Sequence, residues 1–283
     1  MKSIFLNYLN NKSSFFWITV IIMNITICIV VLSEAYGLNF VSTSFVKILG
    51  KTLCLCIVAL AMELVWGYCG ILSLGHFAFF GLGGYMIGMW LMFERTKSIV
   101  IESTQNNILP LTNSEINEAI GTQIFGVVGG AEIPMIWIFA DTLSIHLLLI
   151  LFVPGILAFI FGWLAFRSRV TGVYLSILTQ AMTLGLSLYL FQNDSGLRGN
   201  NGLSGLQNIP NFDNITQAEL SIWFLIASSL TLVATYFICN LVVKSKLGNV
   251  IKGIRDNEAR IRFLGYKVES YKLFVFVITA IIS

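Results

Sequence analysis

Charged residues and prolines are scarce in this sequence. Only 11% of its 283 residues are charged and only 4 are prolines, while 57% are hydrophobic; an ordinary soluble domain has about 25% charged and about 45–50% apolar residues. Several unbroken apolar runs reach the roughly 20 residues that cross a bilayer core. A transmembrane barrel is disfavoured, because its strands show short alternating segments instead. The composition therefore predicts an all-α polytopic membrane protein built as a helical bundle.

Metal-ligand patterns are also missing from the chain. It contains no CxxC motif and no Cys/His spacing typical of a metal site. The five cysteines all lie in apolar runs, at Cys28, Cys54, Cys56, Cys69 and Cys239. Cys54 and Cys56 are two positions apart, so they face different ways on a helix. We interpret all five as small buried hydrophobic residues and expect no metal site.

Apolar runs predict where the chain crosses the membrane. Crossings are expected near residues 15–32, 45–66, 70–93, 143–166, 172–192 and 220–243, with a further one beginning at Leu273. The first run is longer than the roughly 7–15 residues of a signal-peptide core, which favours a retained anchor. The run 133–140 is too short to cross and is expected to be re-entrant or interfacial. The last run ends after 11 residues, so we expect the natural protein to continue beyond Ser283.

Basic residues indicate the orientation, because cytoplasmic loops carry an excess of Lys and Arg. With a cytoplasmic N-terminus, twelve of the 17 basic residues lie inside, namely Lys2, Lys12, Arg167, Arg169 and the eight between Lys244 and Lys272. The segment 94–132 and the stretch NDSGLRGNNGLSGL then lie outside. We expect a multi-pass protein of the plasma (inner) membrane whose N-terminus and 244–272 loop are cytoplasmic.

The stretch GYCGILSLGHFAFFGLGGYMIG, which begins at Gly67, is unusually rich in glycine for a helix. Each glycine costs a helix nearly 1 kcal/mol, about the difference from alanine. One interpretation is close packing of helices at small residues. The other is a broken or re-entrant helix at residues 73–76, whose unwound backbone lines a pathway. An ionisable residue inside a span favours the second interpretation, so Ser73 and His76 are candidate pathway residues.

Polar side chains in two further stretches are candidates for contact with a solute. Thr179 and Gln180 lie in the middle of an expected span, where an unpaired amide is costly. Gln180 either bonds a neighbouring helix or offers hydrogen bonds to a polar neutral solute. In NDSGLRGNNGLSGL, four glycines permit positive φ, and Asn200 and Asn201 supply donors and acceptors. A generic flexible loop, an outer gate and a docking loop all stay open for this stretch.

The segment between the last two expected spans combines charge with apolar side chains. Two short amphipathic pieces flank residues 255–258. Apolar side chains exposed on a cytoplasmic surface need a partner, and a short helix with apolar anchors and a charged rim suits docking into a groove. A purely topogenic basic loop is the alternative. The candidate docking residues are Leu247, Gly248, Ile251, Ile254, Arg255, Asp256, Asn257 and Glu258.

This last segment resembles the coupling-helix segment of ABC importer permeases, which inserts into a cleft on a cytoplasmic ATPase. From about Leu64 to its end, the chain is similar to the branched-chain amino-acid and urea permease family. GVYLSILTQA followed by FQNDSGLRGNNGL is similar to the urea-type members. The amino-acid permeases more usually have a GGPNGI-like loop with a proline where this chain has Asn200-Asn201-Gly202.

The resemblance implies a single permease domain over residues 1–283 that imports a solute, urea above all, with energy from ATP. It also implies the partners: a second, related permease, two cytoplasmic ABC ATPases, an extracytoplasmic solute-binding protein and the lipid bilayer, with no nucleic acid. The chain has no Walker A motif and no catalytic triad. ATP hydrolysis is therefore expected on another chain, and no cofactor is expected on this one.

The polarity of the expected pathway bears on the substrate. An uncharged polar pathway suits urea, a neutral molecule that needs hydrogen-bond donors and acceptors, whereas a zwitterion favours a charge or a helix end near its carboxylate. A branched-chain or other amino-acid importer is the alternative within the family. An ATP-independent channel is an alternative of a different class, and it would leave the amphipathic 244–272 loop as a topogenic segment.

Overall fold

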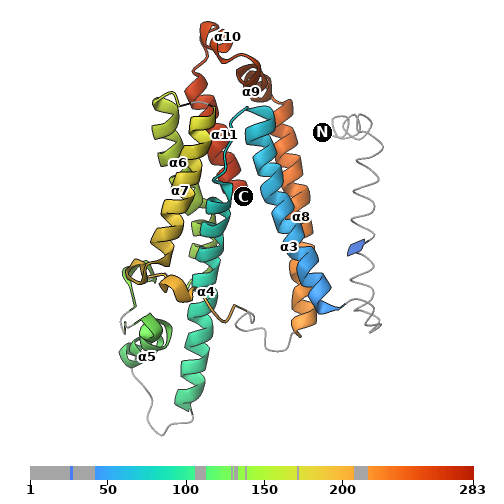
Figure 1. Ribbon diagram of the computed structural model, residues 1–283. Helices are drawn as coiled ribbons and strands as arrows, with labels where there is room; N and C mark the ends of the chain where they lie inside the picture. Colours follow the sequence, from blue (N-terminus) through green and yellow to red (C-terminus); the bar gives the residue numbers. More distant parts are fainter. Residues whose placement is uncertain are drawn as a thin grey trace. The chain divides into compact units, whose positions relative to one another are not determined.

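The computed structural model describes residues 26–27, 42–105, 113–128, 130, 133–137, 139–170, 172–206 and 216–283 (Figure 1). All regular structure within these ranges is helical, which confirms the predicted all-α class. The expected crossing at residues 15–32 lies outside the described residues, apart from Thr26 and Ile27.

Five of the described helical stretches are long and apolar enough to cross a membrane: Thr43–Tyr68, His76–Ser103, Leu143–Arg167, Val173–Phe191 and Gln217–Lys244. The described α-helices are α3 (Thr43–Glu63), α4 (His76–Gln105), α5 (Asn113–Phe125), α6 (Leu143–Arg167), α7 (Val173–Phe191), α8 (Gln217–Lys244), α9 (Lys246–Asp256), α10 (Glu258–Phe263) and α11 (Val268–Ile282). A π-helix, η1 (Leu64–Tyr68), follows α3 directly, and single 3-10 turns are η2 (Gly126–Val128), η3 (Met135–Trp137), η4 (Asn193–Ser195) and η5 (Gly199–Asn201).

Two segments differ from what the hydropathy pattern predicts for them. The crossing expected at 70–93 begins instead at His76 and continues as helix to Gln105. Its extra turns pack on α5, where Phe93 and Val100 share a buried cluster with Ile120. Packing therefore extends the helix beyond the apolar run. The short run at 133–140 forms only the 3-10 turn η3, whose Trp137 side chain is buried in the same cluster.

The chain forms two compact units. The smaller comprises residues 1–54 and 215–232, and the larger comprises residues 55–214 and 233–283, so α3 and α8 contribute to both. In the described part of the smaller unit, Val46 and Leu53 of α3 pack with Leu225 of α8. The larger unit holds the features that concern function.

The core of the larger unit is centred on Phe276 of α11. Its ring makes edge-to-face contacts with Phe79 of α4, at 5.7 Å between centroids, and with Phe166 of α6, at 5.8 Å. Such pairs add about 0.5–1.5 kcal/mol to the effect of burial alone. The sequence indicates only an interrupted crossing here, but α11 buries Val275, Phe276 and Ala280 almost completely. This short helix is therefore a central element of the core.

Glycines bring α6 and α11 close together. A Cβ atom at Gly155 would lie 3.1 Å from the Ile281 side chain, and one at Gly162 would lie 2.9 Å from Leu273 and 3.1 Å from Phe276. Gly155 and Gly162 are two helical turns apart, so both face the same neighbour. The interpretation that small residues permit close helix packing thus applies to α6. From the sequence it was considered only for the glycine-rich stretch that begins at Gly67.

Helix α6 ends in a Schellman motif with an unusual residue in it. The Val170 amide donates to the Ala165 carbonyl at 3.2 Å, and the Arg169 amide donates to the Phe166 carbonyl at 3.0 Å, which is the hydrogen-bond pattern of that motif. The left-handed position is usually glycine, yet here it is Arg169, with φ 56°. An L-residue in this conformation costs about 1–2 kcal/mol.

A substitution at Gly162 tests the packing of α6 against α11. We expect Gly162→Leu to destabilise the protein by about 1–3 kcal/mol, the usual cost of overfilling a packed core. The control is Gly185→Leu on α7, because no atom lies within 4 Å of a Cβ at that position. The midpoint temperature of thermal unfolding, measured on the purified full chain in detergent, should fall for the Gly162 variant only. An equal decrease of the midpoint in both variants would contradict close packing of α6 against α11.

Candidate functional site

The path of the chain between α3 and α4 is interrupted. Glu63 ends the α-helix, five residues form the π-helix η1, residues 69–75 are irregular, and α4 begins at His76. The break predicted at 73–76 is confirmed in part: residues 73–75 are irregular, but His76 already belongs to α4, and the irregular residues connect two crossing helices instead of interrupting one. Buried N–H and C=O groups of such irregular backbone need hydrogen-bond partners within the protein.

Neighbouring helices supply these hydrogen bonds. The hydroxyl of Thr179 on α7 accepts from the Leu74 amide at 3.1 Å, and the hydroxyl of Ser176, one turn earlier, donates to the Leu72 carbonyl at 3.0 Å. The contact is close, because a Cβ at Gly75 would lie 3.0 Å from the Thr179 carbonyl oxygen. Residues 72–75, which we call the break, are therefore held against α7.

His76 links the break to α11. Its Nδ1 lies 3.0 Å from the Ser73 hydroxyl, and its Nε2 lies 3.2 Å from the Thr279 hydroxyl. The ring also meets Phe79 and Phe276 edge to face. The residue is only 1% exposed. Both ring nitrogens thus already have partners inside the chain, so the geometry favours a structural role for His76 over direct contact with a solute.

The six expected pathway residues do not form a single group. The structure brings together Ser73, His76 and Thr179, all of them buried around the break. Gln180, the next residue on α7, is exposed. Asn200 and Asn201 lie in η5 and are also exposed. Their roles as solute contacts stay predictions, with the exposed three free to meet a solute and the buried three already engaged.

The stretch NDSGLRGNNGLSGL is folded into two 3-10 turns. Its four glycines all have positive φ, as predicted. The side chain of Arg198, only 6% of which is exposed, donates from Nη1 to the Gly202 carbonyl at 3.1 Å and to the Ser204 hydroxyl at 2.8 Å. Burial lowers the pKa of this guanidinium. The turn is therefore organised around a buried arginine.

Contacts with other elements anchor the same stretch. The Arg95 side chain on α4 donates to the Gly205 carbonyl at 2.6 Å, and the Trp137 indole donates to the Gly196 carbonyl at 2.7 Å. These hydrogen bonds favour a rigid cap on α4 and η3, formed by residues 193–206, over a generic flexible loop.

The segment 245–273 forms two short helices, α9 and α10, as its pattern predicts. Side chains cap both: Ser245 accepts from the Gly248 amide at 3.3 Å, and Asn257 accepts from the Arg260 amide at 3.0 Å. A Cβ at Gly248 would overlap the Val243 carbonyl oxygen, so this glycine is required by the turn from α8 into α9.

The expectation that the apolar side chains of α9 are exposed is wrong. Ile251 is 1% exposed and Ile254 is 3% exposed, and Ile251 belongs to the core of the larger unit with Leu247 packed against it. Their own chain already covers them. The exposed apolar side chains lie instead at the end of α10, where Phe263 is 92% exposed and Leu264 is 67% exposed. We call Phe263 and Leu264 the α10 tip.

An ion-pair cluster joins α10 to α11. Glu258 accepts from Lys272 at 2.6 Å and from Arg262 at 2.8 Å, and Arg262 also pairs with Glu269 at 2.7 Å. Partial burial pushes the pKa of Glu258 upward, but bonding to Lys272 and Arg262 outweighs that effect and holds the pKa below its ordinary value. Glu258 thus favours folding at neutral pH, and that contribution is lost as the pH falls through the lowered pKa.

A second link runs from α9 to η1, the π-helix that precedes the irregular residues 69–75. The Arg255 side chain donates from Nη1 to the Gly67 carbonyl of η1 at 2.7 Å. Gly70, just beyond η1, has φ 71°, and a Cβ there would lie 3.0 Å from the Arg255 side chain. The exposed residues Asp256 and Asn257 follow. Helix α9 is therefore fastened to the π-turn that introduces the break.

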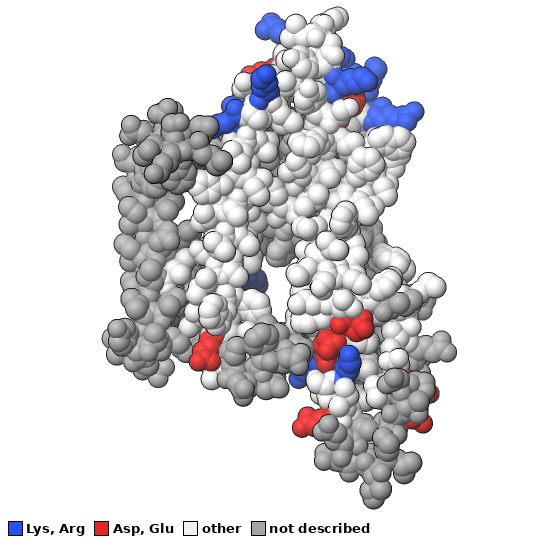
Figure 2. All heavy atoms as spheres, turned by 180° about the vertical axis from the view of Figure 1, so that it is seen from behind, with Lys and Arg blue, Asp and Glu red and all other residues white. Residues whose placement is uncertain are grey.

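Charge is divided between the two ends of the larger unit. Figure 2 shows Lys and Arg gathered over α9 and α10 and most Asp and Glu at the end that carries α5. The basic group includes Lys246, Lys252, Arg255 and Arg260. The acidic group includes Glu102, Glu115 and Glu118. The structure thus preserves the asymmetry from which the orientation was predicted.

Several of these residues were not identified from the sequence. Thr279 is a polar residue in the apolar run LFVFVITAIIS, and Ser176 precedes Thr179 by one helical turn; both are visible as patterns. Neither pattern predicts the hydrogen-bond partner. Ser176 and Leu72 are 104 positions apart in the chain, and Thr279 and His76 are 203 positions apart.

A family model described as branched-chain amino acid transport system / permease component matches residues 44–283. The matched region includes the break, the cap of residues 193–206, and α9 to α11. No curated protein and no solved structure matches the chain.

The bond between Thr179 and the break can be tested with a nearly isosteric change. We expect Thr179→Val to destabilise the protein by about 1–3 kcal/mol, because the Leu74 amide would be left buried without its acceptor. Thr183→Val is the control, since that hydroxyl bonds only to a carbonyl of its own helix. Amide hydrogen exchange of residues 69–75 should accelerate in the first variant alone. Unchanged exchange in Thr179→Val would show that this bond does not hold the break.

Proposed function

The chain belongs to the family of branched-chain amino acid transport permeases, and from that premise we propose that it is the membrane-spanning subunit of an ATP-driven importer. The observation that supports this most strongly is the family match over residues 44–283. Permeases of this family work with ATPase and solute-binding partners. The chain itself is the transport subunit, and a separate ATPase would supply the energy.

In the proposed orientation, α9 and α10 lie in the cytoplasm and the cap of residues 193–206 faces the opposite side of the plasma membrane. The support is electrostatic, because basic residues concentrate over α9 and α10 and cytoplasmic loops attract Lys and Arg. A solute-binding protein would then approach the side with the exposed amides of Asn200 and Asn201. A second permease would complete the pathway.

The α10 tip is the proposed docking point for an ATPase. Large apolar side chains on a charged surface mark a protein contact, and Phe263 and Leu264 extend from a helix that is tied to the core through Glu258 and Lys272. The exposed polar side chains of Arg255, Asp256 and Asn257 would form the rim. This assignment moves the anchors from Ile251 and Ile254 to the next helix.

Two contact routes lead from this docking point to the break. The first passes from Glu258 to Lys272 on α11, and along that helix to Thr279, which contacts His76. The second passes from Arg255 to the Gly67 carbonyl in η1. A push on α9 and α10 would therefore reach both ends of the irregular segment. We propose that ATP-driven closure of the ATPases moves the break through these contacts.

The proposed solute is urea. The expected pathway residues that are exposed, Gln180, Asn200 and Asn201, offer uncharged amide donors and acceptors. Such groups suit a neutral polar molecule better than a zwitterion that requires a counter-charge. A branched-chain amino acid is the second candidate, favoured by the description of the matching family.

The docking proposal predicts a specific loss of ATPase. Phe263→Ser with Leu264→Ser should weaken co-purification of the ATPase at least about tenfold, because burying one such side chain is worth about 1.5–3 kcal/mol. The matched control is Met135→Ser with Ile136→Ser, two adjacent side chains that are 85% and 53% exposed at the other end of the same unit. Full retention of the ATPase by the α10 variant would refute the docking point.

Uptake measurements test the solute. Cells carrying the full-length chain with its partners should accumulate labelled urea only when ATP is present, and excess unlabelled urea should block uptake while leucine does not. If leucine is taken up instead, the importer stands and the urea assignment fails. Flux that persists without ATP would contradict the importer itself and support the ATP-independent channel.

A further inference from the structure

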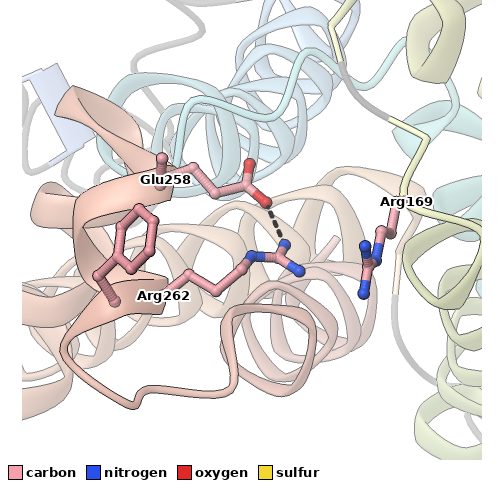
Figure 3. A pocket seen from close by; sticks show the side chains of 5 residues that line it. Arg169, Glu258 and Arg262 are labelled. Carbon is pink, nitrogen blue, oxygen red and sulfur yellow. Dashed lines mark hydrogen bonds and ion pairs between the residues drawn. The ribbon is translucent and has the colours of Figure 1, made fainter.

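Two adjoining hollows lie where α6 ends. The larger, of about 480 Å³, is lined by Arg169, Glu258, Ala259, Arg262 and Phe263 (Figure 3). The smaller, of about 290 Å³, is lined by Trp163, Phe166, Arg167, Arg169, Glu269, Ser270 and Leu273. Arg169 lines both. Figure 3 shows its guanidinium on the opposite side of the larger hollow from the Glu258–Arg262 pair.

The hollows lie at the end of an apolar helix surface. Along α6, the exposed side chains leading to this end include Ile156, Ile160 and Leu164, each more than half exposed. In a membrane-crossing helix such side chains meet lipid tails. Trp163 follows on the same helix, with the Arg167 guanidinium carbon 5.0 Å from the centre of its ring. Trp and Arg in this arrangement mark the depth at which hydrocarbon gives way to headgroups.

The charges in the hollows leave two arginines in excess. Both carboxylates are engaged, Glu258 by Lys272 and Arg262, and Glu269 by Arg262. The side chains of Arg167 and Arg169, by contrast, make no ion pair with any residue in the described ranges. The region therefore attracts an anion to the arginine side, away from the paired glutamates.

The backbone at Arg169 points to a role for its side chain. The residue occupies the left-handed position of a Schellman motif, with φ 56°. The same motif ends α10, where the Tyr266 amide donates to the Ile261 carbonyl and the left-handed residue is Gly265, with φ 89°. Glycine is therefore the unstrained choice, and arginine at the end of α6 opposes the backbone preference. Strain of this kind gathers at functional positions.

We propose that Arg167 and Arg169 form a binding site for the phosphate of an anionic phospholipid, whose glycerol and acyl chains lie against the hollows and the exposed face of α6. Basic pockets beside membrane helices recognise such headgroups. The apolar lining favours a lipid over a soluble phosphate, because Trp163 and Leu273 would contact the glycerol and the first methylenes.

The test uses the purified full chain in detergent, titrated with phosphatidylglycerol or with phosphatidylcholine of the same acyl chains, and native mass spectrometry to count bound lipid. The unmodified protein should retain phosphatidylglycerol preferentially. Arg169→Gln and Arg169→Gly should each weaken that retention about fivefold, which corresponds to about 1 kcal/mol per arginine near an anionic lipid surface. Arg260→Gln is the control, because it removes an equal charge from α10 without lining either hollow.

The glycine variant separates binding from folding. Arg169→Gly removes the side chain and also relieves the left-handed strain, so thermal stability in lipid-free detergent should be unchanged or higher while lipid retention falls. Unchanged retention in both Arg169 variants would overturn the site. So would an equal loss in Arg260→Gln, which would indicate diffuse attraction, or displacement of the lipid by an equal concentration of inorganic phosphate.

Discussion

The larger unit is organised by the need to satisfy the polar backbone groups of an irregular and partly buried stretch of chain. An uninterrupted helix satisfies itself, but residues 69–75 do not form one, so their amides and carbonyls require outside partners. Thr179 and Ser176 supply partners from α7, and Thr279 binds the break through His76 from α11. Three helices are thus held together by the requirements of one irregular segment.

Helix α11 combines several of these functions in 15 residues. Phe276 is the centre of the aromatic core, Thr279 contacts His76, and Lys272 holds Glu258 on α10. A displacement of α10 therefore cannot leave the break unaffected unless these contacts are lost. This geometry gives physical content to the proposed coupling, because the two regions share a rigid element and not merely a path through space.

Arginine replaces glycine at two points where the backbone turns left-handed. Arg169 and Arg198 are the non-glycine residues with positive φ in the described part of the chain. Arg198 is buried and bonds to Gly202 and Ser204 within its own turn, so its side chain organises the cap of residues 193–206. Arg169 is exposed and makes no such bond in the described ranges. For that reason we assign its side chain to the binding of a ligand from outside the protein.

The sequence by itself determined the helical class, the approximate positions of the five described crossing helices, the irregular backbone at 73–75, the division of charge and the two short helices around Asn257, because hydropathy, glycine content and caps are local properties. Tertiary structure alone decided which side chains form hydrogen bonds with the break, that Ile251 and Ile254 face inward, and that α4 continues to Gln105. The amphipathic pattern of α9 indicates an apolar face but does not say whether its own chain or a partner covers it. That choice depends on contacts between residues far apart in the chain, which packing selects and local pattern does not encode.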